Sequence, residues 1–192
     1  MTEPDDAISR AMAEVARADF LPPEQQASAG CDVALPIGRG QTGSQPRTVA
    51  AMLRLLDVRP GHRVLDVGSG SGWSTSLLGR LTGRAGSVHG VELDPRLAEW
   101  GAGNVARYDM AWVHIHRADP ALLGLTAHAP YDRILVSADG GSVPGRLVEQ
   151  LRIGGVMVLP VAGVMTRLVR HEDKQQVTTH GEYRFVPLRW EQ

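Results

Sequence analysis

The chain has 192 residues, of which 43% are hydrophobic and 21% charged, with a formal net charge of −1. This composition suits one globular domain with a proper core, and the spread of basic residues along the chain argues against a nucleic-acid or anionic-membrane partner. The single cysteine, Cys31, excludes an internal disulfide framework and a cysteine-based zinc site. Because the acidic start lacks a signal peptide's apolar segment and no run reaches the ~18 apolar residues of a membrane span, we expect a cytoplasmic protein.

The first part of the chain predicts two amphipathic helices joined by a loop. Residues 5–17 and 47–58 both carry apolar side chains at helical spacing. Between them, residues 35–46 read LPIGRGQTGSQP, with three glycines, two prolines and no acidic residue. That composition indicates a loop rather than a regular element.

From residue 63 onward, strands and helices alternate. Strands are expected at 63–68, 86–93, 111–119, 131–139 and 156–162, and helices at 73–83, 94–109 and 143–155. Two further strands, 166–173 and 175–190, follow without a helix between them. Repeated strand–helix units predict an α/β fold with a mainly parallel, doubly wound, Rossmann-like sheet, and the last pair of strands predicts an antiparallel hairpin on its edge.

A glycine-rich turn stands between the first of these strands and the helix after it. Residues 64–72 read VLDVGSGSG and contain Gly68, Gly70 and Gly72. Such a turn lets the backbone approach a ligand closely and points free N–H groups at it. Glu92 ends the next strand, where a carboxylate can accept hydrogen bonds from ribose hydroxyls. The third glycine of a dinucleotide fingerprint would fall at Trp73, which disfavours NAD.

With Asp66 two residues before its first glycine, the turn resembles the first motif of S-adenosylmethionine-dependent methyltransferases. In that superfamily the turn faces the amino-acid part of the cofactor, and an acidic residue at the position of Asp119 often contacts the adenine amino group. The alternatives are dinucleotide binding and a purely structural turn. The resemblance implies a cofactor site made of Thr42, Asp66, Gly68, Ser69, Gly70, Gly72, Glu92, Leu93, Ala118 and Asp119.

Residues 35–46 are similar to the signature of protein-L-isoaspartate O-methyltransferases, which commonly read L-P-I-G-x-G-Q-T-x-S-x-P. Other segments resemble the same family in order, among them residues 11–22, 131–144 and the RFVPL stretch at 184–188. The resemblance runs from about residue 8 to residue 188. It implies a single methyltransferase domain over 1–192, with N-terminal helices and a substrate loop (1–60), a cofactor-binding core (61–165) and a C-terminal hairpin (166–192).

Members of this family use S-adenosylmethionine to methylate the carboxylate of L-isoaspartyl residues in damaged proteins or peptides. The resemblance makes Ser44 the catalytic residue. It also implies substrate contacts by Pro36, Ile37, Val186 and Leu188. Since a carboxylate with a pKa near ~4 is already ionised at neutral pH, the reaction needs no strong general base. We therefore expect catalysis by positioning and partial desolvation.

Some positions depart from the family pattern and leave other functions open. Gly43 stands where a larger residue is common, and Pro120 follows Asp119 where the family usually has glycine. Asp139 adds a carboxylate near the expected active site, which would repel an anionic substrate unless an arginine pairs with it. One alternative is a paralogue that methylates another carboxylate, on a biosynthetic peptide or small molecule. The other is a non-catalytic nucleotide-binding module.

The remaining polar residues suggest no further chemistry. His114 and His116 alternate on a predicted strand and share one face, but no third ligand lies at metal spacing, so no metal site is expected. Arg39, Arg47 and Arg184 could meet substrate carboxylates, but we interpret them as solvated surface residues. The RFVPL stretch is interpreted as an edge strand, where Pro187 is tolerated, with a possible second role in peptide contact.

Overall fold

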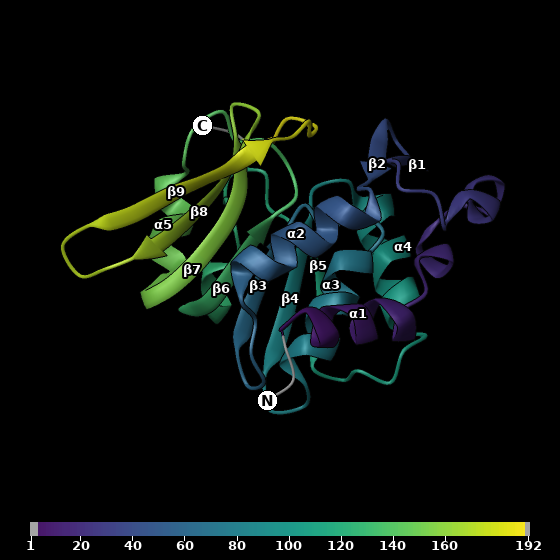
Figure 1. Ribbon diagram of the computed structural model, residues 1–192, viewed down its shortest axis with the longest axis horizontal. Coiled ribbons are helices and arrows are strands. Elements are labelled where there is room, and N and C mark those ends of the chain that lie inside the picture. Colours follow the sequence, from purple (N-terminus) through teal and green to yellow (C-terminus); the bar gives the residue numbers. More distant parts are fainter. Residues whose placement is uncertain (1–3, 191–192) are drawn as a thin grey trace.

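The computed structural model describes residues 4–190, so the first three residues of the predicted N-terminal segment and the last two of the predicted C-terminal hairpin lie outside it. At its centre is a seven-stranded sheet in the order β5-β4-β3-β6-β7-β8-β9 (Figure 1). The strands are β3 (Arg63–Val67), β4 (Ser87–Glu92), β5 (Val113–Arg117), β6 (Tyr131–Val136), β7 (Leu151–Val161), β8 (Val164–Arg170) and β9 (Gln175–Glu182). Strands β3 to β7 are parallel, whereas β7, β8 and β9 pair antiparallel. The predicted fold class is confirmed.

Helices cover both faces of the sheet. They are α1 (Pro4–Glu14), α2 (Pro46–Leu56), α3 (Trp73–Thr82), α4 (Pro95–Val105) and α5 (Gly145–Gln150). Because side chains alternate along a strand, Val64 packs into a core with α1, α2 and α3, while its neighbour Leu65 packs into a second core with α5. Within the described residues, no helix combines the length and apolar character needed to cross a membrane.

The chain order creates a crevice at the carboxyl ends of the central strands. From β3 the chain moves outward to β4 and β5, then returns to place β6 on the other side of β3. Connections on the two sides of this point leave in opposite directions, and ligands of open α/β sheets bind there. The two loops after β3 and β6 therefore face the same space.

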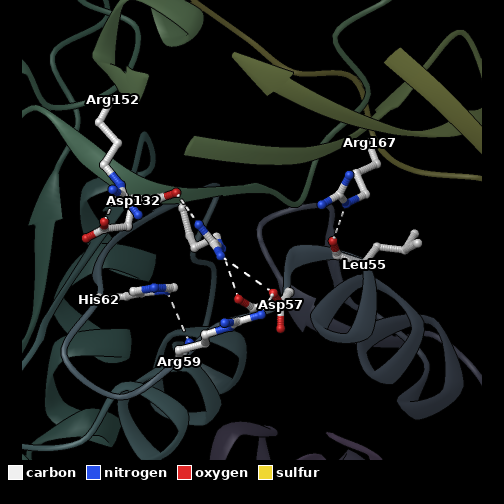
Figure 2. A network of polar contacts seen from close by, with 8 residues as sticks. Leu55, Asp57, Arg59, His62, Asp132, Arg152 and Arg167 are labelled. Atoms are coloured by element: carbon white, nitrogen blue, oxygen red, sulfur yellow. Dashed lines mark hydrogen bonds and ion pairs between the residues drawn. The ribbon is translucent and has the colours of Figure 1, made fainter. Parts of the chain in front are cut away.

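Arginines on β6 and β8 anchor the C-terminal end of helix α2 (Figure 2). Arg133 Nε donates to the carbonyl oxygen of Asp57 at 2.9 Å, and Arg167 Nε donates to that of Leu55 at 2.8 Å. These carbonyls belong to the last turn and cap of α2, which lack partners within the helix. The helix that follows residues 35–46 is thereby fixed to β6 and β8.

The boundary between α5 and β7 differs from the prediction. The helix predicted at 143–155 ends at Gln150, and β7 already begins at Leu151. The two glycines expected to close the helix lie in the strand, where the register with β6 shifts and Gly154 has a φ of +77°. Glycine in a strand often marks such a bulge, and glycine also commonly ends a helix. The sequence alone does not distinguish these two cases.

Residues 35–46 are more regular than predicted, and the C-terminal stretch is less so. Instead of a loop, Leu35–Gly38 (β1) and Gln41–Gly43 (β2) form an antiparallel hairpin. Its turn residues, Arg39 and Gly40, have φ values of 57° and 72°, the left-handed pair that tight hairpins require. The strand predicted at 175–190 ends at Glu182, so RFVPL is not an edge strand, although Pro187 forms a single bridge with Asp139.

Candidate functional site

A cavity of about 370 Å³ lies at the carboxyl ends of β3, β4, β5 and β6. This volume is in the range of small-molecule sites. The β1–β2 hairpin and residues 186–190 form its other walls. Ten residues singled out from the sequence line it: Ile37, Thr42, Gly68, Gly70, Glu92, Leu93, Ala118, Asp119, Val186 and Leu188.

The glycine turn and Glu92 are held together at one wall of this cavity. The amide of Gly70 donates to Glu92 Oε2 at 2.9 Å, and the amide of Asp94 donates to Oε1 at 3.0 Å. Both carboxylate oxygens are therefore fixed, yet each keeps lone pairs for a ligand hydroxyl. Gly70 has a φ of +53°, and a Cβ there would lie 3.0 Å from Ile37 Cδ1, so the turn and the hairpin approach each other closely.

Asp66 lies beneath the turn and does not line the cavity. It is fully buried, and its Oδ2 accepts hydrogen bonds from Ser74 Oγ and Thr75 Oγ1, both at 2.7 Å. Burial raises its pKa to about 6, while the two hydroxyl hydrogen bonds act in the opposite direction. Asp66 thus joins β3 to the first turn of α3 and positions the loop between them.

Two other glycine-turn residues and Pro36 also lie outside the main cavity. Gly72 is the N-cap of α3, where a Cβ would come within 3.0 Å of the carbonyl oxygen of Gly101. Ser69 lines a smaller adjoining cleft, and Pro36 points to the exposed side of β1. Gly72 therefore serves close packing between α3 and α4.

Ser44 lies behind the main cavity, at two small clefts. One cleft includes Ser69 and Trp73, and the other includes Thr48 and Arg184. Thr42 and Ser137 line both of these clefts and the main cavity as well. The main cavity and the two Ser44 clefts therefore adjoin at these two residues. Ser137 was not among the predicted site residues, although it lies in the segment 131–144 that resembles the family, because that resemblance assigned no function to its hydroxyl.

The segment before Ser44 is organised by a buried arginine. The Arg17 guanidinium donates to the carbonyl oxygens of Ala29, Cys31 and Val33 at 3.2, 2.9 and 2.7 Å. It also lies 5.5 Å from the centroid of the Trp73 ring, a cation–π distance. Burial lowers the pKa of Arg17, in spite of opposing effects from Asp32 and Cys31. Arg17 thus holds the whole approach to the hairpin against α3.

Asp139 has a different environment from the one expected. Its carboxylate accepts hydrogen bonds from the amides of Gly141, Ala162 and Gly163, at 2.7 to 2.9 Å. Partial burial alone would raise the pKa of Asp139, but these three bonds lower it overall. Its main chain also bonds with Val186 and Leu188. Since Asp139 lines neither the main cavity nor the Ser44 clefts, it anchors the C-terminal segment rather than facing the site.

The three arginines interpreted as surface residues have separate environments. Arg39 Nε donates to Asp94 Oδ2 at 2.8 Å, which ties the hairpin turn to the start of α4 at the edge of the main cavity. Arg47 pairs with Asp32, and Arg184 lines the Ser44 cleft. Arg184 and Ser44 thus line the same cleft.

Comparison with known proteins gives the family. The family model for protein-L-isoaspartate(D-aspartate) O-methyltransferase matches residues 2–192. A protein-L-isoaspartate O-methyltransferase of Methanopyrus kandleri is 42% identical over 94% of this chain and 82% of its own length. One from Methanococcoides burtonii is 40% identical over 96% and 92%. A solved protein-L-isoaspartate O-methyltransferase superposes with a TM-score of 0.86 at 26% identity, over 95% of this chain and 61% of its own. The chain therefore belongs to the protein-L-isoaspartate(D-aspartate) O-methyltransferase family.

Proposed function

We propose that this protein transfers the methyl group of S-adenosylmethionine to the carboxylate of L-isoaspartyl residues in damaged proteins or peptides. The observation that carries the proposal is the position of Ser44. It lies behind Thr42 and Ser137, and those two residues also line the cofactor-sized cavity. A methyl donor in the cavity and a carboxylate beside Ser44 would meet where the cavity and the clefts adjoin, at Thr42 and Ser137. The resulting ester collapses to a succinimide, whose hydrolysis returns part of the damage to normal aspartate.

The donors and acceptors of the main cavity fit this cofactor. The glycine turn suits its amino-acid part, and the fixed carboxylate of Glu92 suits the ribose hydroxyls. Asp119 accepts the amide of Ala121 on Oδ1 at 3.0 Å, so its other oxygen is free to accept from an adenine amino group. Pro120, which replaces a family glycine, leaves this acceptor in place. When bound, S-adenosylmethionine supplies an electrophilic methyl group on a cationic sulfur.

Residues of the Ser44 cleft would hold the acceptor. The Ser44 hydroxyl would donate a hydrogen bond to one carboxylate oxygen and leave the other oxygen to accept the methyl group, which bound S-adenosylmethionine would supply with its neutralised sulfur as the leaving group. Arg184 adds a charge-assisted contact that draws the carboxylate into the cleft. Proximity and orientation are the main catalytic effects, because the nucleophile is already ionised.

Recognition of the peptide would use the walls that the hairpin and the C-terminal segment provide. Ile37, Val186 and Leu188 line the main cavity, and Val186 extends to the Ser44 cleft. An isoaspartyl residue carries an extra backbone methylene, so main-chain hydrogen bonds can separate it from aspartate. The amide of Asp139 already donates a hydrogen bond to the carbonyl oxygen of Val186. The opposite backbone edge of this segment is therefore the one available to a peptide.

A transfer assay with paired peptides tests the proposal. The protein is incubated with S-adenosylmethionine labelled in the methyl group and with two peptides that differ only in isoaspartate or aspartate at one position. We expect base-labile label on the isoaspartyl peptide alone. If neither peptide is labelled but calorimetry still detects cofactor binding, isoaspartate is not the acceptor, and another carboxylate is favoured. Loss of both transfer and cofactor binding would contradict methyl transfer altogether.

A further inference from the structure

A group of histidines gathers on the α5 face of the sheet, away from the Ser44 clefts. His89 comes from β4, His114 and His116 from β5, and His128 from the 3-10 helix Thr126–His128. His89 and His114 are register partners on the neighbouring strands. Chain spacing around His114 and His116 had suggested no third ligand, but the fold supplies two more imidazoles from other elements. A ligand group drawn from three elements leaves no motif in the sequence.

Three of these rings have the separation of a metal site. One ligand atom each from His89, His116 and His128 lies within 4.8 Å of the others, and His89 Nδ1 is 3.0 Å from His116 Nε2. Two imidazole nitrogens bound tetrahedrally at about 2.0–2.1 Å from one ion lie about 3.3–3.4 Å apart. The His89–His116 pair is therefore already near the required separation.

The third ring needs only a local rotation. His128 stacks on His89, with ring centroids 4.0 Å apart, so its nitrogens run beside those of His89 rather than toward a common point. His128 is exposed and lies in a single 3-10 turn, whereas His89 is 6% exposed within the sheet. A turn of the His128 ring would complete the group without moving β4 or β5.

The chemistry of these ligands selects the class of ion. Neutral imidazoles suit zinc, nickel, copper and cobalt, while magnesium and calcium prefer oxygen ligands. Arg63 Nη1 donates to the carbonyl oxygen of His128 at 3.5 Å, which ties the backbone of His128 to β3. With His89 buried, His116 half-buried and His128 exposed, three histidine ligands leave a fourth, solvent-facing position for water or hydroxide.

We propose that His89, His116 and His128 form a site for a divalent late first-row transition metal ion, with Zn²⁺ as its representative. The ion would fasten residues 118–130 to β4 and β5. That segment also supplies Asp119 and Leu122 to Gly124 to the main cavity. Metal binding would hold that wall of the cavity in place, so the site has a structural function and lies outside the methyl-transfer chemistry.

Zinc titration of tag-free, metal-stripped protein tests the site. Calorimetry should give one zinc per chain for the wild type. We expect His128→Ala and His116→Ala to weaken binding by more than about tenfold, since even outer-shell changes cost about 10–100-fold. His180→Ala is the matched control, because His180 is an exposed histidine on β9 whose ring contacts Thr178. It should bind zinc as the wild type does.

Cobalt and thermal unfolding give independent readouts. Co²⁺ bound by three histidine nitrogens and one water should give the visible absorption of a four-coordinate site. We expect this absorption in the wild type and in His180→Ala, and not in His128→Ala. Zinc should raise the unfolding temperature of the first two proteins alone, because an ion stabilises the folded state only if it binds there. Equal zinc binding by His128→Ala and the wild type, or no binding by the wild type, would overturn the proposal.

Discussion

The guanidinium of Arg17 donates a hydrogen bond from Nη2 to the carbonyl oxygen of Ser44, at 3.1 Å. Arg17, the first residue of the 3-10 helix Arg17–Phe20, is thus connected directly to the backbone of the residue that we propose to hold the acceptor carboxylate. The same side chain satisfies three other carbonyls between residues 29 and 33. The position of Ser44 therefore depends on a side chain 27 residues earlier in the chain.

Replacement of Arg17 by lysine should reduce both stability and methyl transfer. Lysine keeps the charge but cannot span four carbonyl oxygens with a planar fork. The four carbonyls are part-buried, so water replaces some of the lost hydrogen bonds, and the free energy of unfolding should fall by about 1–3 kcal/mol in total. Denaturant unfolding and peptide-methylation kinetics measure the two effects. Wild-type turnover in folded Arg17→Lys would show that Ser44 is positioned without Arg17.

Ser44→Ala should slow methyl transfer and leave cofactor binding unchanged. A hydrogen bond to a charged group contributes about 1.5–3 kcal/mol, which corresponds to about 10- to 150-fold in kcat/KM. Ser142→Ala is the control, because Ser142 is exposed and lines neither the main cavity nor the Ser44 clefts. It should retain wild-type kinetics. Unchanged kcat/KM in Ser44→Ala would remove Ser44 from the reaction, whatever the control shows.

The sequence predicted most of the sheet because its strands are short apolar runs separated by glycine and proline. It could not predict the β1–β2 hairpin, whose turn uses the non-glycine residue Arg39 at a φ of 57°. Nor could the sequence show whether Gly154 ends a helix or lies in a strand bulge, as it does in the structure. In both places, local glycine content fits two structures, and tertiary pairing decides between them.

The candidate site was predictable where a motif marks it and not elsewhere. Ser44 and the glycine turn lie in recognisable stretches, and the structure brings them together at one small cleft beside the main cavity. Arg17, Ser137 and the histidine group depend on contacts between distant segments, which no spacing along the chain reveals. Asp66 is a third case. The motif correctly places it next to the glycine turn, but it does not show that the side chain is buried beneath the turn and supports it.

Asp66 should give the stability of the protein a distinctive pH dependence. Burial raises the pKa of this carboxyl from 3.8 to about 6. Since the folded pKa is the higher one, the folded state binds more protons than the unfolded state between about pH 4 and pH 6. Stability therefore falls as pH rises through this window, by up to about 3 kcal/mol for a shift of this size.

Asp66→Asn isolates this contribution. Asparagine keeps the shape and can still accept the hydrogen bonds of Ser74 and Thr75, but it does not titrate. The free energy of unfolding, measured in denaturant from pH 4 to 7, should fall more steeply with pH in the wild type than in the variant. Parallel profiles for the two proteins would show that Asp66 has no raised pKa.

Asp139→Ala distinguishes an anchoring carboxylate from a repelling one. If Asp139 repelled the substrate, its removal would lower the KM for an isoaspartyl peptide. Because its carboxylate instead binds the amides of Gly141, Ala162 and Gly163, removal should loosen the loops that hold residues 183–190. Val186 and Leu188 would then line the cavity less firmly, so we expect a higher KM for the peptide and an accompanying loss of thermal stability.

Kinetics at saturating cofactor measure this KM, and Asp173→Ala serves as the matched control. Asp173 is an exposed acidic residue in the turn between β8 and β9, away from the main cavity and the Ser44 clefts. The control removes the same charge from the protein, so any general electrostatic effect on an anionic peptide appears in both variants. A KM below wild type in Asp139→Ala but not in Asp173→Ala would support repulsion at the site and contradict the anchoring function. A KM for the peptide that rises in Asp139→Ala and not in Asp173→Ala is the result expected from loss of the hydrogen bonds between the Asp139 carboxylate and the three backbone amides.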